Sequence, residues 1–199
     1  MGHTWIDFTF DYVDPGSYLA HRLLARWVAD RPYPIRVRWV ALELRAPPAS
    51  QLDPPAGEWA ALMAAMERIA SDEGIPFVCP EGLPWTRKAH ELALHAKEKG
   101  RFDRIHTALF EAHFVHALDI GRVDTLASLA EAQGLSGAEA RTVLGVDRFA
   151  PEVERGRAEA LAGGVRGVPT LETEGRRLEG FTRAADVLNF LDRLGGNDG

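Results

Sequence analysis

The sequence predicts an α/β fold in which two short units join in one central mixed sheet, with a large all-helical segment inserted between them. Two observations lead to this prediction. Residues 4–42 give a strand, a helix and a strand, the order of a β-α-β unit with parallel strands. Residues 150–194 give a helix, two short strands and a final helix. Each unit is too small to close a core alone, so we expect them to share one sheet.

The first unit begins with residues 4–12, which alternate and are rich in aromatic and β-branched side chains. Asp14-Pro15 then marks a helix start, because an acid at the N-cap and a proline at the first helical position are both favoured there. This helix runs to about residue 30. Residues 35–42 alternate again and form the second strand.

A proline-rich linker, residues 47–55, separates this unit from a long helical stretch. Glycines at the ends of the helical patterns act as stops. The helices are expected near 57–73, 85–99, 101–118, 122–133 and 136–144, with stops at Gly74, Gly100, Gly121 and Gly134. We therefore predict an inserted helical domain over 56–149 and a discontinuous domain over 1–46 and 150–199.

The final unit starts with a helix near 150–163. Two short strands, residues 170–173 and 177–179, follow around a Glu174-Gly175 turn. A last helix is expected from about 182 to 194, where apolar residues recur at helical spacing.

Composition excludes several classes of protein. The net charge of −6 over 199 residues argues against a nucleic-acid-binding surface, which needs a clustered excess of Lys and Arg. A single cysteine, Cys79, excludes an internal disulfide and a cysteine-cluster metal site. We expect no signal peptide, because residues 5–8 are interrupted by the charge of Asp7 and alternate like a strand. We expect no membrane span, because no apolar run approaches the roughly 20 residues that a span needs. The expected location is the cytoplasm.

Several motifs resemble the DsbA-like branch of the thioredoxin fold that holds FrnE-like oxidoreductases, 2-hydroxychromene-2-carboxylate isomerases and kappa-class glutathione transferases. The most specific is Gly-Val-Pro-Thr at residues 167–170, which follows a glycine-capped helix. Residues 11–20 are similar to the isomerases. The segments that resemble FrnE-like oxidoreductases are residues 37–45, 86–90 and 109–114. The resemblance covers nearly the whole chain and implies a thioredoxin fold with a helical insertion.

The resemblance implies that Pro169 is cis and lies beside Asp14 in space. In this fold that proline exposes the backbone of the preceding residue, here Val168, so that glutathione or an extended peptide can pair with it as a short strand. Ligand-binding residues expected around this cleft are Val168, Pro169, Trp85, Tyr12, Phe181 and Thr182.

The chain departs from its relatives where the chemistry is expected. Redox members carry Cys-x-x-Cys at the start of the first helix, and the isomerases and transferases carry a serine at the first of these positions. This chain has Asp14-Pro15-Gly16-Ser17. Phe181-Thr182 replaces the Ser-Asp pair that holds the γ-glutamyl group in kappa transferases. Dithiol exchange at Asp14 and Ser17 is therefore chemically impossible.

Two interpretations of Asp14 and Ser17 remain open. Asp14 is either a helix cap alone, worth about 1 kcal/mol, or also a group that faces a ligand as a general base or as a repulsive gate against thiolates. Ser17 either donates a hydrogen bond to a bound thiolate or hydroxyl, or bonds only to the backbone. We take both as candidate catalytic residues.

The histidines and the cysteine do not predict a metal site or a reactive thiol. His106, His113 and His116 share a helical face, but we predict no metal site, since core or solvated histidines are the commoner outcome. Cys79 is expected to be a small buried hydrophobic residue, with a reactive thiol as the alternative.

The predicted function is that of a DsbA-like protein that has lost its redox centre. It would bind glutathione or a small organic acid for isomerase or transferase chemistry. No cofactor is required in this interpretation, and glutathione is the one candidate. The alternative is a non-catalytic module that binds an extended peptide or a partner protein through Val168 and Pro169. Relatives in this superfamily are often dimers, and the resemblance therefore implies a homodimer as one candidate partner state.

Overall fold

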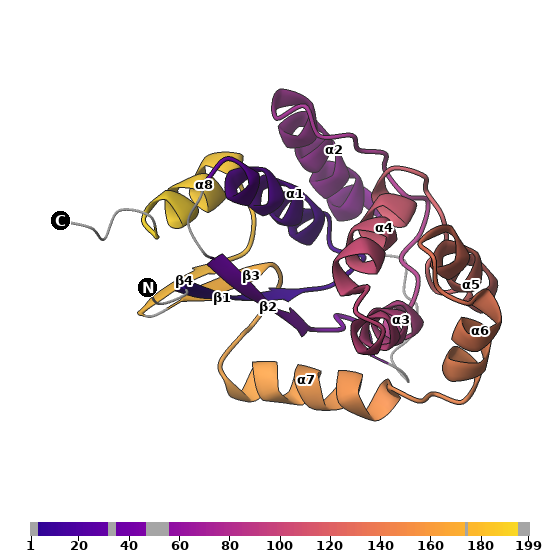
Figure 1. The fold of residues 1–199 in the computed structure, drawn as a ribbon. Coiled ribbons are helices and arrows are strands. Elements are labelled where there is room, and N and C mark those ends of the chain that lie inside the picture. The colour runs from indigo at the N-terminus through magenta and orange to yellow at the C-terminus, as the bar shows by residue number, and fades with distance from the viewer. Residues whose placement is uncertain (1–3, 32–34, 47–55, 174, 195–199) are drawn as a thin grey trace.

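The centre of the molecule is a four-stranded mixed sheet with the strand order β2-β1-β3-β4 (Figure 1). β1 pairs in parallel with β2 and antiparallel with β3, and β3 pairs antiparallel with β4. The strands are β1 (Thr4–Phe10), β2 (Ile35–Ala41), β3 (Thr170–Thr173) and β4 (Arg176–Glu179). Strands from both ends of the chain form one sheet, as predicted. The computed structural model describes residues 4–31, 35–46, 56–173 and 175–194.

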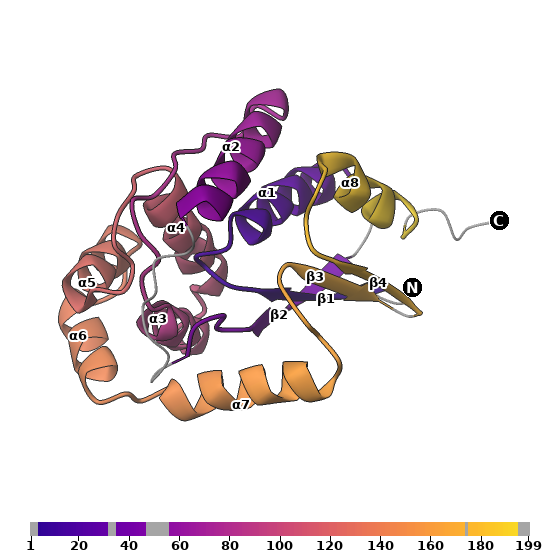
Figure 2. The ribbon, with the colours of Figure 1, turned by 180° about the vertical axis from the view of Figure 1, so that it is seen from behind.

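Helices lie on both faces of this sheet. α1 (Pro15–Ala29) and α8 (Ala184–Asp192) lie side by side on one face, and α7 (Ala150–Ala162) lies across the opposite face (Figures 1 and 2). α7 lies against β2, the edge strand. The sheet is therefore the middle layer of three.

The inserted helices gather at the end of the sheet where β1 leads into α1 (Figure 1). They are α2 (Ala56–Asp72), α3 (Arg87–Glu98), α4 (Phe102–Phe114), α5 (Val123–Ala132) and α6 (Gly137–Gly145). This arrangement confirms the predicted thioredoxin fold with a large helical insertion. The proline-rich linker predicted at 47–55 lies outside the described residues.

Three of the four predicted glycine stops have the left-handed backbone that ends a helix: Gly74, Gly100 and Gly134 have φ values of +61°, +66° and +81°. The fourth prediction was wrong. Helix α4 ends at Phe114, where 118 was predicted, and Ala117 takes the left-handed conformation with φ +50° in place of Gly121. The Leu118 N–H then bonds to the carbonyl of Ala112, which closes this helix end.

One hydrophobic cluster extends from the sheet into the insertion. The ring of Phe10 on β1 lies 5.9 Å from that of Phe110 on α4, and Tyr18 on α1 stacks on Phe114 at 5.2 Å. The Tyr18 hydroxyl donates to the carbonyl of Pro76. These contacts fix the N-terminal half of α1 between the sheet and the insertion. The division into domains at 46, 56 and 149 stays a prediction.

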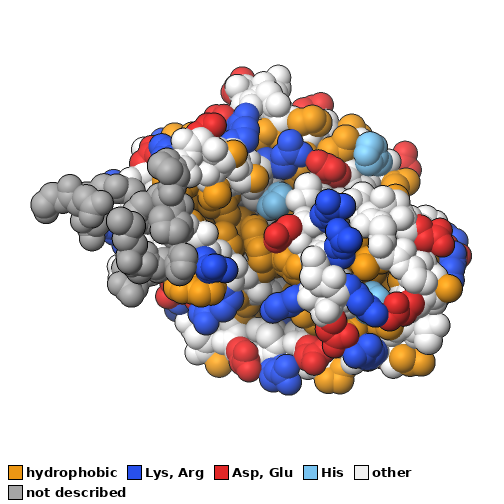
Figure 3. Space-filling model, in the orientation of Figure 1, with side chains coloured by type: hydrophobic (Ala, Val, Ile, Leu, Met, Phe, Trp, Pro, Cys, Tyr) orange, Lys and Arg blue, Asp and Glu red, His pale blue; other side chains and the backbone are white. Residues whose placement is uncertain are grey.

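The surface carries charges of both signs, and apolar side chains gather in a hollow near the middle of the view in Figure 3. Within the described residues, the structure contains no helix with the length and apolar character needed to cross a bilayer.

Candidate functional site

Asp14 caps helix α1, and its side chain is held by the first turn. Its backbone is extended (φ −88°, ψ 115°), and Pro15 follows as the first helical residue. The Oδ2 atom of Asp14 accepts hydrogen bonds from the Ser17 backbone N–H at 2.5 Å and from the Ser17 hydroxyl at 2.6 Å. Asp14 is therefore an N-cap, as its place in the sequence predicts.

The environment of Asp14 favours the protonated acid. Burial raises the pKa of Asp14 from 3.8 to about 7, the negative charge of Asp11 adds to this rise, and the hydrogen bonds from Ser17 and Gly16 oppose it. Since this pKa lies near neutrality, Asp14 can both accept and release a proton under ordinary conditions. General acid–base catalysis needs this property.

Ser17 is fully buried, and its hydroxyl hydrogen is used on Asp14. The Asp11 N–H approaches the Ser17 Oγ at 3.5 Å. Because the donor of Ser17 points to Asp14, this side chain orients the carboxylate and does not face a ligand directly. The helix N-terminus likewise uses its N–H groups to hold the charge of Asp14 itself.

Residues far apart in the sequence meet at Gly16. A Cβ atom placed on Gly16 would lie 2.8 Å from the Phe181 Cβ, 3.0 Å from the Pro169 Cδ and 3.3 Å from the Asp14 Oδ2. Only glycine fits here without displacing Phe181 or Pro169. Asp14, Pro169 and Phe181 thus surround one point, and the peptide bond between Val168 and Pro169 is cis.

The Pro169 loop is anchored by its own backbone. The Pro169 carbonyl accepts a hydrogen bond from the Gly180 N–H at 2.8 Å, and the Thr170 hydroxyl donates to the Gly167 carbonyl. Val168 is partly buried, and within the described part of the chain neither its N–H nor its C=O has a hydrogen-bond partner. This backbone is therefore free to pair with an extended ligand.

Two of the expected ligand-binding residues have hydroxyl groups that bond to other side chains. Tyr12 is fully buried, and its hydroxyl bonds to the Nδ1 of His106 at 2.9 Å, so it belongs to the core between sheet and insertion. Thr182 is exposed, and its hydroxyl donates to the carboxylate of Asp186 at the start of α8.

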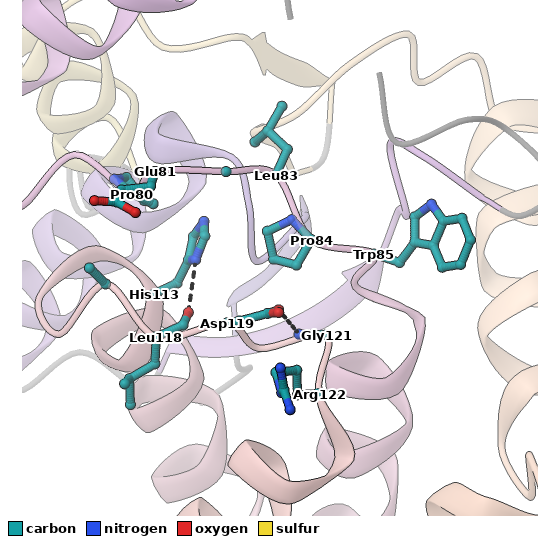
Figure 4. A pocket seen from close by; sticks show the side chains of 12 residues that line it. Pro80, Glu81, Leu83, Pro84, Trp85, His113, Leu118, Asp119, Gly121 and Arg122 are labelled. Carbon is teal, nitrogen blue, oxygen red and sulfur yellow. Dashed lines mark hydrogen bonds between the residues drawn. The ribbon is translucent and has the colours of Figure 1, made fainter. Parts of the chain in front are cut away.

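Trp85 borders a separate cavity of about 600 Å³ (Figure 4). The segment 80–85 forms one side of this cavity, and the loop between α4 and α5 forms the other. His113 stands between them. The predicted site residues therefore divide into a cluster at the α1 N-terminus and a second hollow that contains Trp85.

The structure adds a buried acid that the sequence analysis did not select. Asp11 is fully buried, accepts the Leu44 N–H at 2.8 Å, and lies 3.0 Å from the Nε2 of His90. Its charge raises the pKa of Asp14. The available signal was its position three residues before the helix cap at the end of a buried strand.

Cys79 is exposed, so the prediction of a buried cysteine was wrong. Its segment runs over the surface between α2 and α3, where the neighbouring Val78 is exposed as well. Partial desolvation and the charge of Glu67 raise the pKa of the Cys79 thiol, which disfavours the reactive thiolate. Among the described residues, no group of three or more His, Cys, Asp or Glu side chains is arranged to hold a metal ion.

A cis-proline loop beside the N-terminus of the first helix, on a mixed sheet with a helical insertion, defines a protein of the DsbA-like thioredoxin class. The chain belongs to the family of the DSBA-like thioredoxin domain, whose model matches residues 5–193.

Comparison with individual proteins agrees with this class. The uncharacterized protein YwbO of Bacillus subtilis is 30% identical over 140 residues, which cover 67% of this chain and 68% of YwbO. The fold is similar to that of a 2-hydroxychromene-2-carboxylate isomerase, with a TM-score of 0.81, 20% identity, and coverage of 96% of this chain and 94% of the isomerase. It is also similar to the cytosolic disulfide reductase DsbM of Pseudomonas aeruginosa with GSH, with a TM-score of 0.69, 18% identity, and coverage of 96% and 98%. At these identities the two structures show the fold alone.

Proposed function

We propose that this DsbA-like protein binds a small thiol, such as glutathione, or a small organic acid at the N-terminus of α1, and catalyses a non-redox isomerisation or transfer there. The observation that carries the proposal is the carboxyl of Asp14, whose pKa of about 7 and place beside Pro169 suit proton transfer to a bound ligand. The fold is shared with a 2-hydroxychromene-2-carboxylate isomerase and with a disulfide reductase described with GSH, which makes an isomerisation and glutathione the first reaction and the first ligand to test.

In the proposed reaction, the ionised form of Asp14 accepts a proton from one atom of the ligand, and the protonated form returns it to another atom. No oxidant or reductant is needed, because one proton leaves and one is returned. The Ser17 N–H and O–H stabilise Asp14 while it carries the negative charge. In this proposal the N–H and C=O of Val168 pair with the backbone of a peptide-like ligand.

A titration with reduced glutathione and with its S-methyl analogue tests this function. We expect micromolar binding of glutathione and weaker binding of the analogue, because only the thiol end reaches Asp14. Ser17→Ala is expected to weaken the binding of glutathione, since it removes one donor that orients Asp14. If Asp14→Asn and Ser17→Ala both left affinity and turnover unchanged, the proposed mechanism would be wrong.

A second candidate is a non-catalytic module for an extended peptide, and the unpaired backbone of Val168 supports it. This function depends on Val168 and Pro169 and not on Asp14. Pro169→Ala is then expected to abolish binding of a peptide selected from a random library, while Asp14→Asn is expected to leave that binding intact. Loss of peptide binding in Asp14→Asn would favour the first function.

A further inference from the structure

The 600 Å³ cavity beside Trp85 contains a buried hydrogen-bond acceptor without a donor. His113 is almost fully buried, and its Nδ1 lies 3.4 Å from the carbonyl oxygen of Leu118. A carbonyl only accepts hydrogen bonds, so Nδ1 carries the hydrogen, and burial lowers the pKa of His113 and keeps the ring neutral. The Nε2 atom therefore has a lone pair, and among the described residues it has no partner.

Figure 4 shows this second ring nitrogen on the side of His113 that faces the segment 81–83, one wall of the cavity. An unpaired buried acceptor is unfavourable unless another molecule supplies a hydrogen. A ligand with an N–H or O–H group near this wall would remove that cost.

Three charged side chains around the same cavity can still form ion pairs or hydrogen bonds with a ligand. Arg122, Glu81 and Asp119 are exposed, and within the described part of the chain no ion pair joins Arg122 to either acid. One oxygen of Asp119 accepts the Gly121 N–H at 2.9 Å, which holds this carboxylate in the loop (Figure 4). The cavity thus offers one cationic donor and three acceptor groups, counting Nε2 of His113.

This set of groups selects the charge of the ligand. A simple dicarboxylate would be repelled by Glu81 and Asp119, and a simple amine would leave Arg122 without a counter-charge. A zwitterion with an ammonium and a carboxylate matches both signs. Leu83, Leu118 and Pro84 add apolar wall, and the volume lies in the range of small-molecule sites.

We propose that this cavity binds the head group of an α-amino acid with an apolar side chain. The carboxylate of the ligand pairs with Arg122. Its ammonium donates hydrogen bonds to the acceptors, which are Nε2 of His113 and the carboxylates of Glu81 and Asp119. Its side chain lies against Leu83 and Pro84, near Trp85. This site is separate from Asp14 and goes beyond the proposed function.

Calorimetric titration with L-phenylalanine, N-acetyl-L-phenylalanine and L-phenylalanine amide tests the proposal. The free amino acid is expected to bind, and both derivatives at least about tenfold more weakly, since each lacks one charge of the head group. Equal binding of all three would overturn the assignment. No binding of any probe at millimolar concentration would also overturn it. In that case a water molecule would donate the hydrogen bond to Nε2 of His113.

Variants locate the binding on this cavity. Arg122→Gln is expected to weaken L-phenylalanine at least about tenfold, while Arg104→Gln, an exposed arginine on α4 outside the cavity, is the matched control and should leave affinity unchanged. His113→Phe should weaken binding as well, and Arg122→Gln remains decisive should that variant fail to fold. An unchanged affinity in Arg122→Gln refutes the site. The glutathione titration reports separately on Asp14, because reduced glutathione and its S-methyl analogue share the same amino-acid head.

Discussion

Asp14 combines the contacts of a helix cap with a pKa near neutrality. Its hydrogen bonds from Ser17 are those of an ordinary N-cap, and they favour the ionised form. Burial and the nearby charge of Asp11 favour the neutral form more strongly. The balance leaves a carboxyl that titrates near neutral pH.

Replacing Asp14 with Asn is expected to change the pH dependence of stability. The folded-state pKa of Asp14 is raised from 3.8 to about 7, so the native state binds its proton more tightly, and stability from this group falls as pH rises from about 4 to 7. Asn keeps a cap and does not titrate. The free energy of unfolding of Asp14→Asn minus that of the wild type should therefore grow over this range by up to about 4 kcal/mol. Urea unfolding at several pH values measures it, and a constant difference would contradict the raised pKa.

Gly16 is a second residue whose role depends on its neighbours. Gly→Ala within a helix ordinarily stabilises by up to about 1 kcal/mol. Gly16→Ala is expected to destabilise, because the new Cβ would lie 2.8 Å from Phe181 and 3.0 Å from Pro169. Gly156→Ala in α7 is the matched control, since its Cβ would have only a contact at 3.8 Å, and it should stabilise. The melting temperatures of both variants test this prediction. A higher melting temperature in Gly16→Ala would mean that the Pro169 loop is free to move.

At the scale of elements, one arginine connects three of them. Arg87 at the start of α3 bonds to Glu43, just after β2, at 2.8 Å, and to Glu154 on α7 at 2.7 Å. Glu43 is fully buried, whereas Glu154 is exposed. The two ion pairs of Arg87 therefore differ in their surroundings.

Removing the buried partner is expected to cost much more than removing the exposed one. Arg87→Ala leaves the buried carboxylate of Glu43 without its counter-charge, and a loss of about 3–5 kcal/mol follows. Glu154→Gln should change stability by less than about 1 kcal/mol, because surface ion pairs contribute little. Chemical unfolding at pH 7 compares the two variants. Equal losses would show that Glu43 is reached by solvent or takes up a proton without strain.

At the scale of the whole molecule, buried histidines lie where the sheet side meets the insertion. The ring of His21 on α1 lies 4.8 Å from that of His106 on α4, and that of His106 lies 4.2 Å from that of Trp39 on β2. Burial lowers the pKa of His21 from 6.5 to about 4 and that of His106 well below its usual value. Protonation of these side chains therefore opposes the packing of sheet on insertion.

Acid is expected to destabilise the protein through this contact. The folded-state pKa of His21 is depressed, so its contribution is complete above about pH 6.5 and is lost as pH falls toward 4. His21→Phe should remove up to about 3 kcal/mol of this loss. The difference in unfolding free energy between variant and wild type should grow as pH falls, opposite in direction to Asp14→Asn. A difference that is flat between pH 7 and 4 would contradict a buried neutral His21.

Local patterns in the sequence predicted most of the secondary structure, the cap at Asp14 and the class of fold, but not the end of α4. Helix starts, glycine stops and strand alternation depend on neighbours within a few residues, so Asp14-Pro15 and Gly74 can be identified without a structure. The Gly-Val-Pro-Thr motif also indicated the family before any geometry was known, and the absence of cysteine at positions 14 and 17 led to the prediction that dithiol exchange does not occur there.

Only the tertiary structure decided how those residues can act. The pKa of Asp14, the burial of Ser17 and Tyr12, and the exposure of Cys79 depend on what packs against each side chain from distant parts of the chain. The same holds for the cavity around His113, whose walls come from two separate segments. Desolvation and packing are long-range in sequence, and no local pattern carries them.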